Sequence, residues 1–256
     1  MHLLHSIPLL HLLSFSIAFL IGFVLLTEAA PHTTGVPIYV MLPLDLIDPQ
    51  TRQLNNPQQL QAQLSTLKQQ ANIDGVLCDM WWGIVEQTAP HNYYWQPYQT
   101  LINTILRPLK LKLLPIMSFH SCGGNVGDEC NIPLPPWVTA VGKSVFYTDR
   151  EGRVDYEYLS AAVDNITLFQ GRTPLNMYSD YMINFRDNIL FNNSDIISQV
   201  EISLGPAGEL RFPAYPTGTY PGVGEFQCYD PYMLQQLKQA AIDAGQPEWG
   251  NGGPGM

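Results

Sequence analysis

Charged side chains are scarce in this sequence of 256 residues, and basic ones are the scarcest. Only 13% of the residues are charged, and 12 Lys and Arg against 22 Asp and Glu leave a net charge of −10. An acidic chain without a cluster of Lys and Arg would repel the phosphates of nucleic acid, so we expect no nucleic-acid partner. A neutral polymer such as a polysaccharide would not be repelled. The 46% of hydrophobic residues are enough for a substantial core.

Cysteine is also rare, and its spacing argues against a metal centre. The chain has four cysteines and no Cys-x-x-Cys pair, so we expect no zinc site and no other bound metal. Cys122 and Cys130 flank one glycine-rich loop and could form a local disulfide. Cys78 lies inside an apolar run and is expected to be a buried free thiol.

A long apolar run occurs at the amino terminus and not elsewhere. Residues 7–26 are almost wholly apolar, and the small residues Ala29 and Ala30 follow. This pattern predicts a signal peptide over residues 1–30, and hence a protein that is secreted or enters an endomembrane or lysosome-like compartment. The first residues lack Lys and Arg, and the run could span a bilayer, so an uncleaved signal anchor is the alternative. After cleavage we expect no membrane partner. Glycosylation sequons at Asn165 and Asn192 fit secretion.

Apolar strand-like runs alternate with helical patterns in the rest of the chain. The expected strands cover residues 36–42, 75–80, 111–119 and 195–204, and the expected helices cover residues 56–70, 95–106, 155–169, 174–191 and 232–244. Such alternation predicts an α/β fold with parallel strands and helices outside. A doubly wound sheet and a (β/α)8 barrel both fit this order. Four βα units cannot close an eight-stranded barrel, so the second choice would mean a half barrel.

A turn of glycine and proline places Glu209 just beyond the fourth expected strand. Arg211, Phe212 and Tyr215 follow it closely. An acid in an apolar, aromatic pocket holds its proton more tightly than an acid in water and can serve as a general acid. We therefore expect Glu209 to be largely buried and to act as a proton donor. The alternative is a surface residue in a proline-rich turn.

Asp79 ends the second expected strand, beside Trp81 and Trp82. Carboxylates hydrogen-bond to sugar hydroxyls, and indole faces stack on the apolar face of a pyranose ring. The alternative is a pair of core tryptophans beside an Asp that caps a helix.

His120 ends the third expected strand and opens a glycine-rich loop, with Asp128 at the far end of that loop. Such a loop can close over a substrate and exclude water, although a lone histidine in this place is more often structural. Asp45, Asp79, His120 and Glu209 all lie at or just after the carboxyl ends of four expected strands, which is where a barrel gathers its catalytic residues, so we favour the barrel. The expected lid consists of Gly123, Gly124, Asn125, Val126 and Gly127.

Two of these segments closely resemble the signatures of glycoside hydrolase family 14, the β-amylases. They are His120-Ser-Cys-Gly-Gly-Asn-Val-Gly-Asp128 and Gly205-Pro-Ala-Gly-Glu-Leu-Arg-Phe-Pro213. The similarity extends from Gly35 to Trp249, nearly all of the expected mature chain. Departures such as Ser121 and Ala214 are conservative.

The resemblance implies a (β/α)8 barrel that hydrolyses α-1,4-glucosidic linkages with inversion. Its substrates would be starch, glycogen-like glucans and maltooligosaccharides, from whose non-reducing ends it would release β-maltose. By this resemblance Glu209 matches the general acid, and residues 123–130 match the mobile lid. Asp79, His120 and Asp128 match residues that hold the glucose units at the non-reducing end. No cofactor is implied.

The sequence departs from the family in one respect. An inverting glycosidase needs an acid and a base on opposite faces of the sugar ring, and the family supplies its base from the other half of the barrel. Neither Glu225 nor Glu248 lies in a matching motif. Residues 31–256 are therefore expected to be a truncated, amino-terminal half of the catalytic barrel that is inactive alone. The alternative is a non-catalytic half-barrel protein that binds α-glucans or has a regulatory role.

Overall fold

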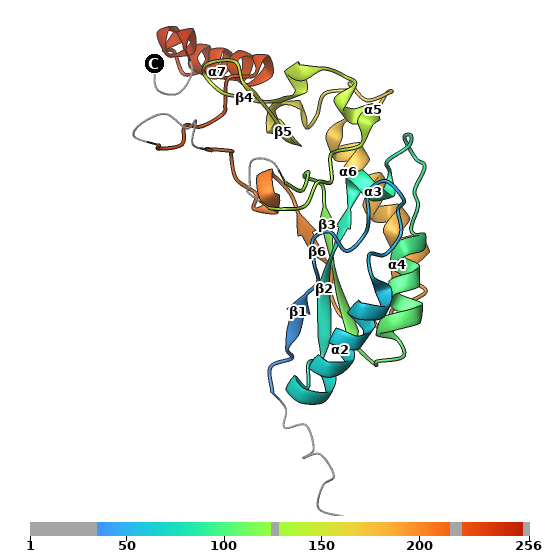
Figure 1. Cartoon of the computed structure of the whole chain (residues 1–256). Helices are drawn as coiled ribbons and strands as arrows, with labels where there is room; N and C mark the ends of the chain where they lie inside the picture. The colour runs from blue at the N-terminus through green and yellow to red at the C-terminus, as the bar shows by residue number, and fades with distance from the viewer. Residues whose placement is uncertain (1–34, 124–127, 216–221, 253–256) are drawn as a thin grey trace, which may run out of the picture. The chain divides into compact units, whose positions relative to one another are not determined.

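A four-stranded parallel sheet carries the elements around the candidate site (Figure 1). The computed structural model describes residues 35–123, 128–215 and 222–252. The strands are β1 (Tyr39–Met41), β2 (Gly75–Trp81), β3 (Lys112–Ser118) and β6 (Glu201–Ser203), in the order β1-β2-β3-β6, within one compact unit that begins at Ile38. This confirms the predicted parallel sheet.

The register brings the carboxyl ends of three neighbouring strands to one level. Trp81 of β2 lies opposite Ser118 of β3, and Ser118 lies opposite Ser203 of β6. Parallel pairing requires that side chains following these strands emerge at the same edge of the sheet. Asp79, His120 and Glu209 belong to these three strands or follow them.

Three helices cover one side of the sheet with buried apolar residues. Figure 1 shows α2 (Pro57–Ala71), α4 (Gln96–Leu101) and α6 (Pro174–Phe185) on one side of it. Leu60 and Leu64 are the buried residues of α2, one turn apart. Helices α4 and α6 each continue into a π-helical turn, over Ile102–Leu106 and Arg186–Leu190.

The remaining elements are short or lie near the end of the chain. Asp230 caps the amino terminus of α7 (Pro231–Asp243), where its side chain accepts hydrogen bonds from two backbone N–H groups. No described helix is long and apolar enough to cross a membrane. The short helices are α3 (Trp82–Val85) and α5 (Pro136–Thr139), and single 3-10 turns cover Lys143–Val145, Ala161–Val163, Pro206–Gly208 and Pro247–Asn251.

One predicted helix is wrong. Residues 155–169 form strand β5 (Val154–Leu159) and a short 3-10 turn, and β5 pairs antiparallel with β4 (Phe146–Thr148). Glu157 is buried whereas its neighbour Tyr156 is 44% exposed, as the alternating faces of a strand require. The fourth predicted strand is also shorter than residues 195–204, because only Glu201–Ser203 pair continuously with β3.

The sheet is open at both edges among the described residues. Strand β1 pairs only with β2, and β6 pairs only with β3. Met41 of β1 is 43% exposed, and Ile202 of β6 is 52% exposed. Four parallel strands with helices on one side and two unpaired edges are the arrangement of a partial barrel rather than a closed one.

Candidate functional site

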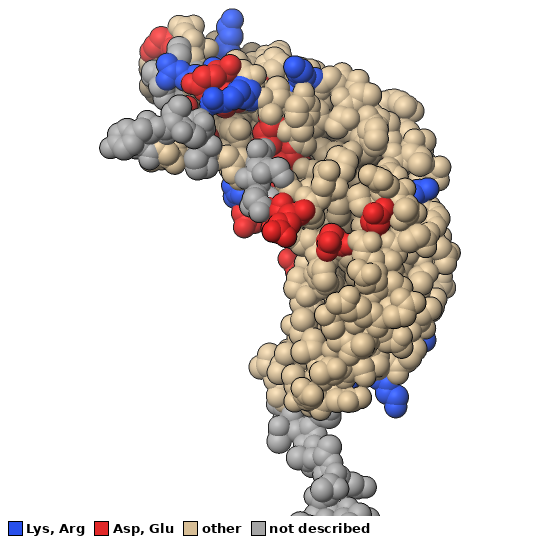
Figure 2. All heavy atoms as spheres, viewed as in Figure 1, with Lys and Arg blue, Asp and Glu red and all other residues tan. Residues whose placement is uncertain are grey.

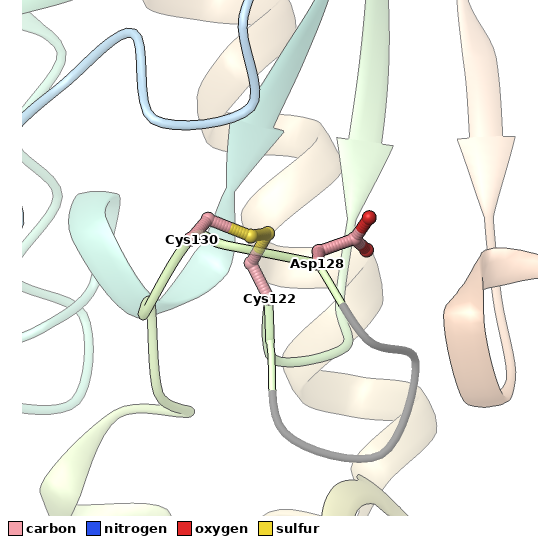
Figure 3. Close-up of side chains that lie close together, drawn as sticks. All are labelled: Cys122, Asp128 and Cys130. Carbon is pink, nitrogen blue, oxygen red and sulfur yellow. A yellow bond between two sulfur atoms is a disulfide. The ribbon is translucent and has the colours of Figure 1, made fainter.

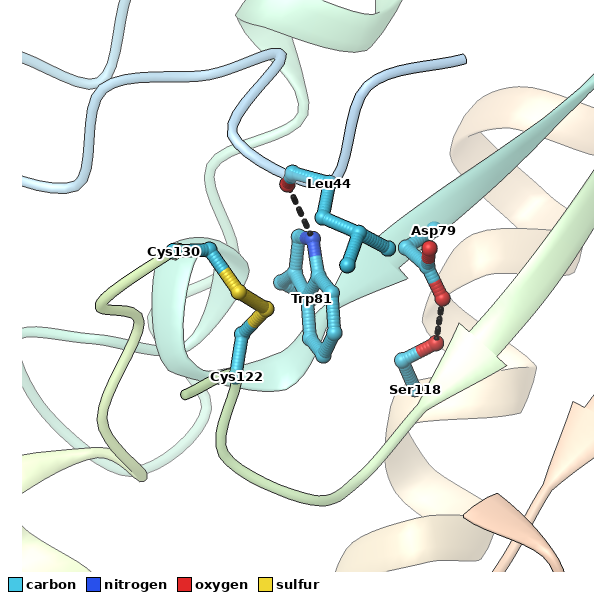
Figure 4. Close-up of a disulfide and its surroundings, with 6 residues drawn as sticks. All are labelled: Leu44, Asp79, Trp81, Ser118, Cys122 and Cys130. Carbon is cyan, nitrogen blue, oxygen red and sulfur yellow. Dashed lines mark hydrogen bonds between the residues drawn. A yellow bond between two sulfur atoms is a disulfide. The ribbon is translucent and has the colours of Figure 1, made fainter. Parts of the chain in front are cut away.

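Asp79 lies in β2 with one carboxylate oxygen engaged. The Ser118 hydroxyl donates a hydrogen bond of 2.5 Å to Oδ1 (Figure 4). The other oxygen, Oδ2, is buried and has no hydrogen-bond partner within the described part of the chain. Burial raises the pKa of Asp79 to about 6; the Ser118 hydrogen bond opposes this, and the charges of Glu201 and Asp128 add to it. Oδ2 of Asp79 can therefore accept a hydrogen bond from a further donor.

His120 follows β3 and is only 9% exposed. Burial lowers its pKa to about 4, and the charge of Glu209 opposes this change. The imidazole is therefore neutral near pH 7, and a neutral imidazole can donate one hydrogen bond and accept another. Its Nδ1 is buried without a partner among the described residues. The ring lies edge-on to Trp81, with 5.2 Å between the ring centroids.

The two tryptophans beside Asp79 belong to the core. Trp81 is 3% exposed and donates through its indole N–H to the Leu44 carbonyl (Figure 4), and Trp82 is fully buried and donates to Glu86. Neither presents an open indole face in this structure. Asp79 itself bonds to a neighbouring strand and not to a helix amino terminus.

Glu209 is exposed, so the prediction that it is largely buried is wrong. Its side chain is 63% exposed and accepts a hydrogen bond of 2.5 Å from Nε of Arg211. An aromatic hollow does lie beside this segment, but Tyr147, Tyr158, Leu210 and other neighbours line it and Glu209 does not. The physical reason is the position of β6 at an open edge, where no described element covers the outer side of the segment.

The turn before Glu209 nevertheless sits tightly against His120. Gly208 adopts a φ of 72°, and a Cβ there would collide with the Ser203 hydroxyl and lie 3.1 Å from Cε1 of His120. Glycine is therefore required at this point by both conformation and space. The close approach places the Glu209 segment next to His120, consistent with the influence of its charge on that imidazole.

A disulfide closes the loop that follows His120. Cys122 and Cys130 are bonded, with 5.7 Å between their Cα atoms, and Figure 3 shows Asp128 beside them. Gly123 has a φ of 96°, and a Cβ there would collide with the Cys130 carbonyl. The rest of the predicted lid, residues 124–127, lies outside the described residues. Cys122, Asp128 and Cys130 are close enough to share an ion, but the two sulfurs are bonded to each other and cannot serve as thiolate ligands.

Acidic side chains converge near the strand ends. Figure 2 shows Asp and Glu side chains gathered where β2, β3 and β6 end in the same view. Ser118 joins Asp79 to the strand that His120 follows, and the turn before Glu209 packs against His120, so these groups lie at one edge of the sheet. The charge of Asp128 acts on Asp79. Asp45, the remaining strand-end acid, is exposed and lines a different hollow beside α2. Carboxylates and a neutral imidazole at one edge can hydrogen-bond several hydroxyls of a sugar.

Two polar residues of this region escaped the sequence analysis. Ser118 was hidden within an apolar strand, although its hydroxyl holds Asp79. Glu157 was placed in a predicted helix, but it lies in β5 with 2% exposure and accepts hydrogen bonds from Ala207 and Tyr215. Burial raises the pKa of Glu157, and these hydrogen bonds oppose that change. The alternation of polar and aromatic residues in Val154–Leu159 was the signal that could have revealed it.

Comparison with known proteins agrees with this geometry. The family described as glycosyl hydrolase family 14 matches residues 39–255. Beta-amylase 5 of Arabidopsis thaliana is 49% identical over 221 residues, which cover 84% of this chain and 44% of that protein. The chloroplastic beta-amylase 2 of Oryza sativa subsp. japonica is 46% identical over 228 residues, covering 86% of this chain and 41% of that one.

A solved structure gives the same result for the fold. The crystal structure of the catalytic domain of beta-amylase from Paenibacillus polymyxa superposes with a TM-score of 0.68 at 33% identity, covering 84% of this chain and 49% of that chain. This chain thus spans less than half the length of the two plant relatives. The family match spans the residues that carry Asp79, His120 and Glu209, the sequence identity and the fold agree with it, and the chain belongs to glycosyl hydrolase family 14.

Proposed function

We propose that this chain forms the amino-terminal half of a β-amylase-type enzyme, which releases β-maltose from the non-reducing ends of α-1,4-glucans with inversion. The observation that carries the proposal is the meeting of Asp79, His120 and the Glu209 segment at the ends of three adjacent parallel strands. These residues lie within the family match, and the relatives named above are beta-amylases.

In this proposal Glu209 donates a proton to the glycosidic oxygen as the bond breaks. The second carboxylate, which activates the attacking water on the opposite face of the sugar, comes from the remaining length of the barrel. Cover from that half would also bury Glu209, which the open edge of the sheet leaves exposed.

Asp79, His120 and Asp128 hold the glucose units at the non-reducing end. Oδ2 of Asp79 accepts a hydrogen bond from a sugar hydroxyl, and Nδ1 of His120 engages another, because both atoms are buried and unpartnered among the described residues. Such bonds position the second glycosidic linkage at the acid, which accounts for a disaccharide product.

A fusion tests the assignment of Glu209. The chain is joined in frame to the carboxyl-terminal remainder of the Arabidopsis thaliana relative, and maltose release from soluble starch is measured, with polarimetry to identify the anomer. We expect β-maltose from the fusion and a loss of about 10²–10⁴-fold in kcat for its Glu209→Gln variant.

Glu248→Gln serves as the matched control, because Glu248 is an exposed acid on the turn that follows α7. It should leave kcat unchanged. Equal kcat for the Glu209→Gln and unmutated fusions would remove Glu209 from the role of proton donor.

We also propose that residues 31–256 by themselves release no maltose. The reason is the absence of a matching general base in this stretch. Purified residues 31–256 are incubated with soluble starch beside the Glu209→Gln variant. If the unmutated protein releases β-maltose and the variant does not, a base lies within this stretch or two copies complete one site. Binding of maltooligosaccharide without turnover by residues 31–256 is expected for a half enzyme and for a glucan-binding protein alike; a fusion that binds maltooligosaccharide and releases no maltose would favour the glucan-binding role.

Entry into the secretory route is a separate proposal. It is supported by the apolar run over residues 7–26 and by the Cys122–Cys130 disulfide, since disulfides persist in oxidising compartments. Amino-terminal sequencing of the mature protein should begin near residue 30 or 31. A product that keeps residues 7–26 would indicate a membrane anchor.

A further inference from the structure

Glu157 is a buried carboxylate with both oxygens engaged by one neighbouring segment. It lies in β5 and is 2% exposed. Oε1 accepts a hydrogen bond of 2.5 Å from the backbone N–H of Ala207, and Oε2 accepts one of 2.5 Å from the Tyr215 hydroxyl. Ala207 and Tyr215 flank Glu209 in sequence, so both contacts fall on the segment that carries it.

A chain of polar contacts continues from Glu157 to Glu209 itself. The Tyr215 hydroxyl accepts a hydrogen bond of 3.2 Å from Nη2 of Arg211, and Nε of Arg211 donates to Glu209 at 2.5 Å. The Arg211 guanidinium also lies over the Tyr215 ring, 5.1 Å from its centroid. The hydroxyl and the ring of Tyr215 both contact Arg211 and fix its position. The hydrogen bond from Arg211 in turn orients the carboxylate of Glu209.

The turn at Ala207 explains why such an anchor is needed. Ala207 has a φ of 53°, a left-handed conformation that is costly for a residue with a Cβ. Its N–H donates to the Glu157 carboxylate. A hydrogen bond to a charged acceptor is stronger than one to a neutral acceptor, so it can hold a strained turn closed.

The backbone of the same residue reaches the other side of the site. The Glu157 carbonyl accepts a hydrogen bond of 2.8 Å from the N–H of Ser121, the residue that follows His120. Residue 157 therefore fixes two loops at once, the one that begins at His120 and the one that carries Glu209.

We propose that Glu157 is a positioning residue that locks the Ala207–Tyr215 segment and thereby orients Glu209. The functional part of this inference rests on the proposed role of Glu209 as proton donor. The groups that face Glu157 are Asp155 on its own strand and Arg211, Tyr215 and the Ala207 amide on the opposite segment. Glutamate suits this position because two donors converge on it, and a carboxylate offers two acceptor oxygens.

The test uses the whole chain and compares two substitutions of Glu157 by side chains of similar volume. Glu157→Leu fills the space and accepts nothing, whereas Glu157→Gln retains one acceptor oxygen for the Ala207 N–H. Hydrogen exchange of individual amides is followed by NMR. We expect Glu157→Leu to speed exchange at Ala207 by at least about tenfold, since a buried N–H loses a charged partner. Glu157→Gln should bring the rate back to within about threefold of the unmutated rate.

A second measurement follows Arg211, whose Nε–H donates a hydrogen bond to Glu209. The Nε–H signal of Arg211 should exchange faster in both Glu157→Gln and Tyr215→Phe. Tyr215→Phe removes the hydroxyl between Glu157 and Arg211, and Glu157→Gln replaces the oxygen that accepts from this hydroxyl with an NH2 donor. This readout uses mild substitutions and stays informative if Glu157→Leu does not fold.

Asp230→Asn is the matched control. Asp230 is also fully buried, and it bonds to Ser160 next to β5 and to the first amides of α7. Its substitution should speed exchange at Met233 and leave Ala207 and Arg211 unchanged.

Two outcomes would overturn the proposal. One is equal exchange at Ala207 in the Leu and Gln variants, which would mean that Glu157 only fills space. The other is an unchanged Arg211 signal in both Glu157→Gln and Tyr215→Phe. None of these measurements requires turnover, so they can fail while the kcat test of Glu209 succeeds, or the reverse.

Discussion

Asp79 and Glu209 both accompany parallel strands of one sheet, yet their surroundings differ. Asp79 lies in β2, which has β1 on one side and β3 on the other; its side chain is part-buried, and one of its oxygens accepts a hydrogen bond. Glu209 follows β6, which pairs only with β3 among the described strands, and its side chain is 63% exposed. A side chain at a strand end is shielded from water only where neighbouring elements lie on both sides of its strand. The two carboxylates therefore differ in exposure and in hydrogen bonding because the central strand has a neighbour on each side and the edge strand has a neighbour on one side.

The comparison predicts that the centre and the edge of the sheet contribute unequally to stability. Met80→Ala in β2 removes a fully buried side chain and should lower the free energy of unfolding by about 2–5 kcal/mol. Ile202→Ala in β6 removes a side chain that is 52% exposed and should cost less than about 1 kcal/mol. Urea unfolding of both variants measures the difference. Equal losses would mean that the edge strand is covered in solution.

His120 and Asp79 should make opposite contributions to the pH dependence of the free energy of unfolding. The pKa of His120 is lowered to about 4, so its neutral form stabilises the fold, and that contribution is lost as the pH falls from about 6.5 to 4. The pKa of Asp79 is raised to about 6, so its contribution is present below about 3.8 and is lost as the pH rises to about 6. Each amounts to about 3 kcal/mol, and the two nearly cancel between pH 4 and 6.

Single substitutions should separate these two contributions. On acidification, the free energy of unfolding relative to that of the unmutated chain should fall in Asp79→Asn and rise in His120→Gln, because each variant removes one of the two opposed contributions. Urea unfolding between pH 4 and 6.5 gives both slopes. Parallel slopes in the two variants would contradict the assignment.

The disulfide loop beside His120 should contribute about 2–4 kcal/mol. Reduction with dithiothreitol should lower the midpoint of urea unfolding of the unmutated chain. The double variant Cys122→Ser and Cys130→Ser should show the lower midpoint under both conditions. Cys228→Ser, which removes a half-buried free thiol, should retain the full response to the reductant.

The smallest effect is expected at the edge carboxylate. Glu209→Gln in this chain removes an exposed ion pair with Arg211 and should change the free energy of unfolding by less than about 1 kcal/mol. A loss of several kcal/mol would show that Glu209 is buried in solution, and the contrast with Asp79 would disappear.

Much of the sheet could be predicted because its information is local. Strands β2 and β3 are largely apolar runs, interrupted in β2 by Asp79, and both lie within one or two residues of their predicted bounds. The helix at Pro231–Asp243 begins with an Asp cap and a proline, which are local signals as well. The short separation of Cys122 and Cys130 was sufficient to predict that they could form a disulfide, and the structure contains it.

The β4–β5 hairpin could not be predicted in the same way. Six residues, Val154–Leu159, become a strand only because Phe146–Thr148 pairs with them, and that pairing is a property of the folded chain. The mistaken helix also concealed Glu157, since its importance depends on the Ala207–Tyr215 segment some 50 residues away in sequence.

The sequence alone determined the four strands of the parallel sheet and the placement of Asp79, His120 and Glu209 at or after the ends of three of them, because apolar periodicity and glycine and proline turns act over a few residues. Tertiary structure alone decided the protonation of His120, the partner of Asp79 and the exposure of Glu209. These properties depend on how much water and which side chains surround each group, and residues far apart in sequence supply those surroundings.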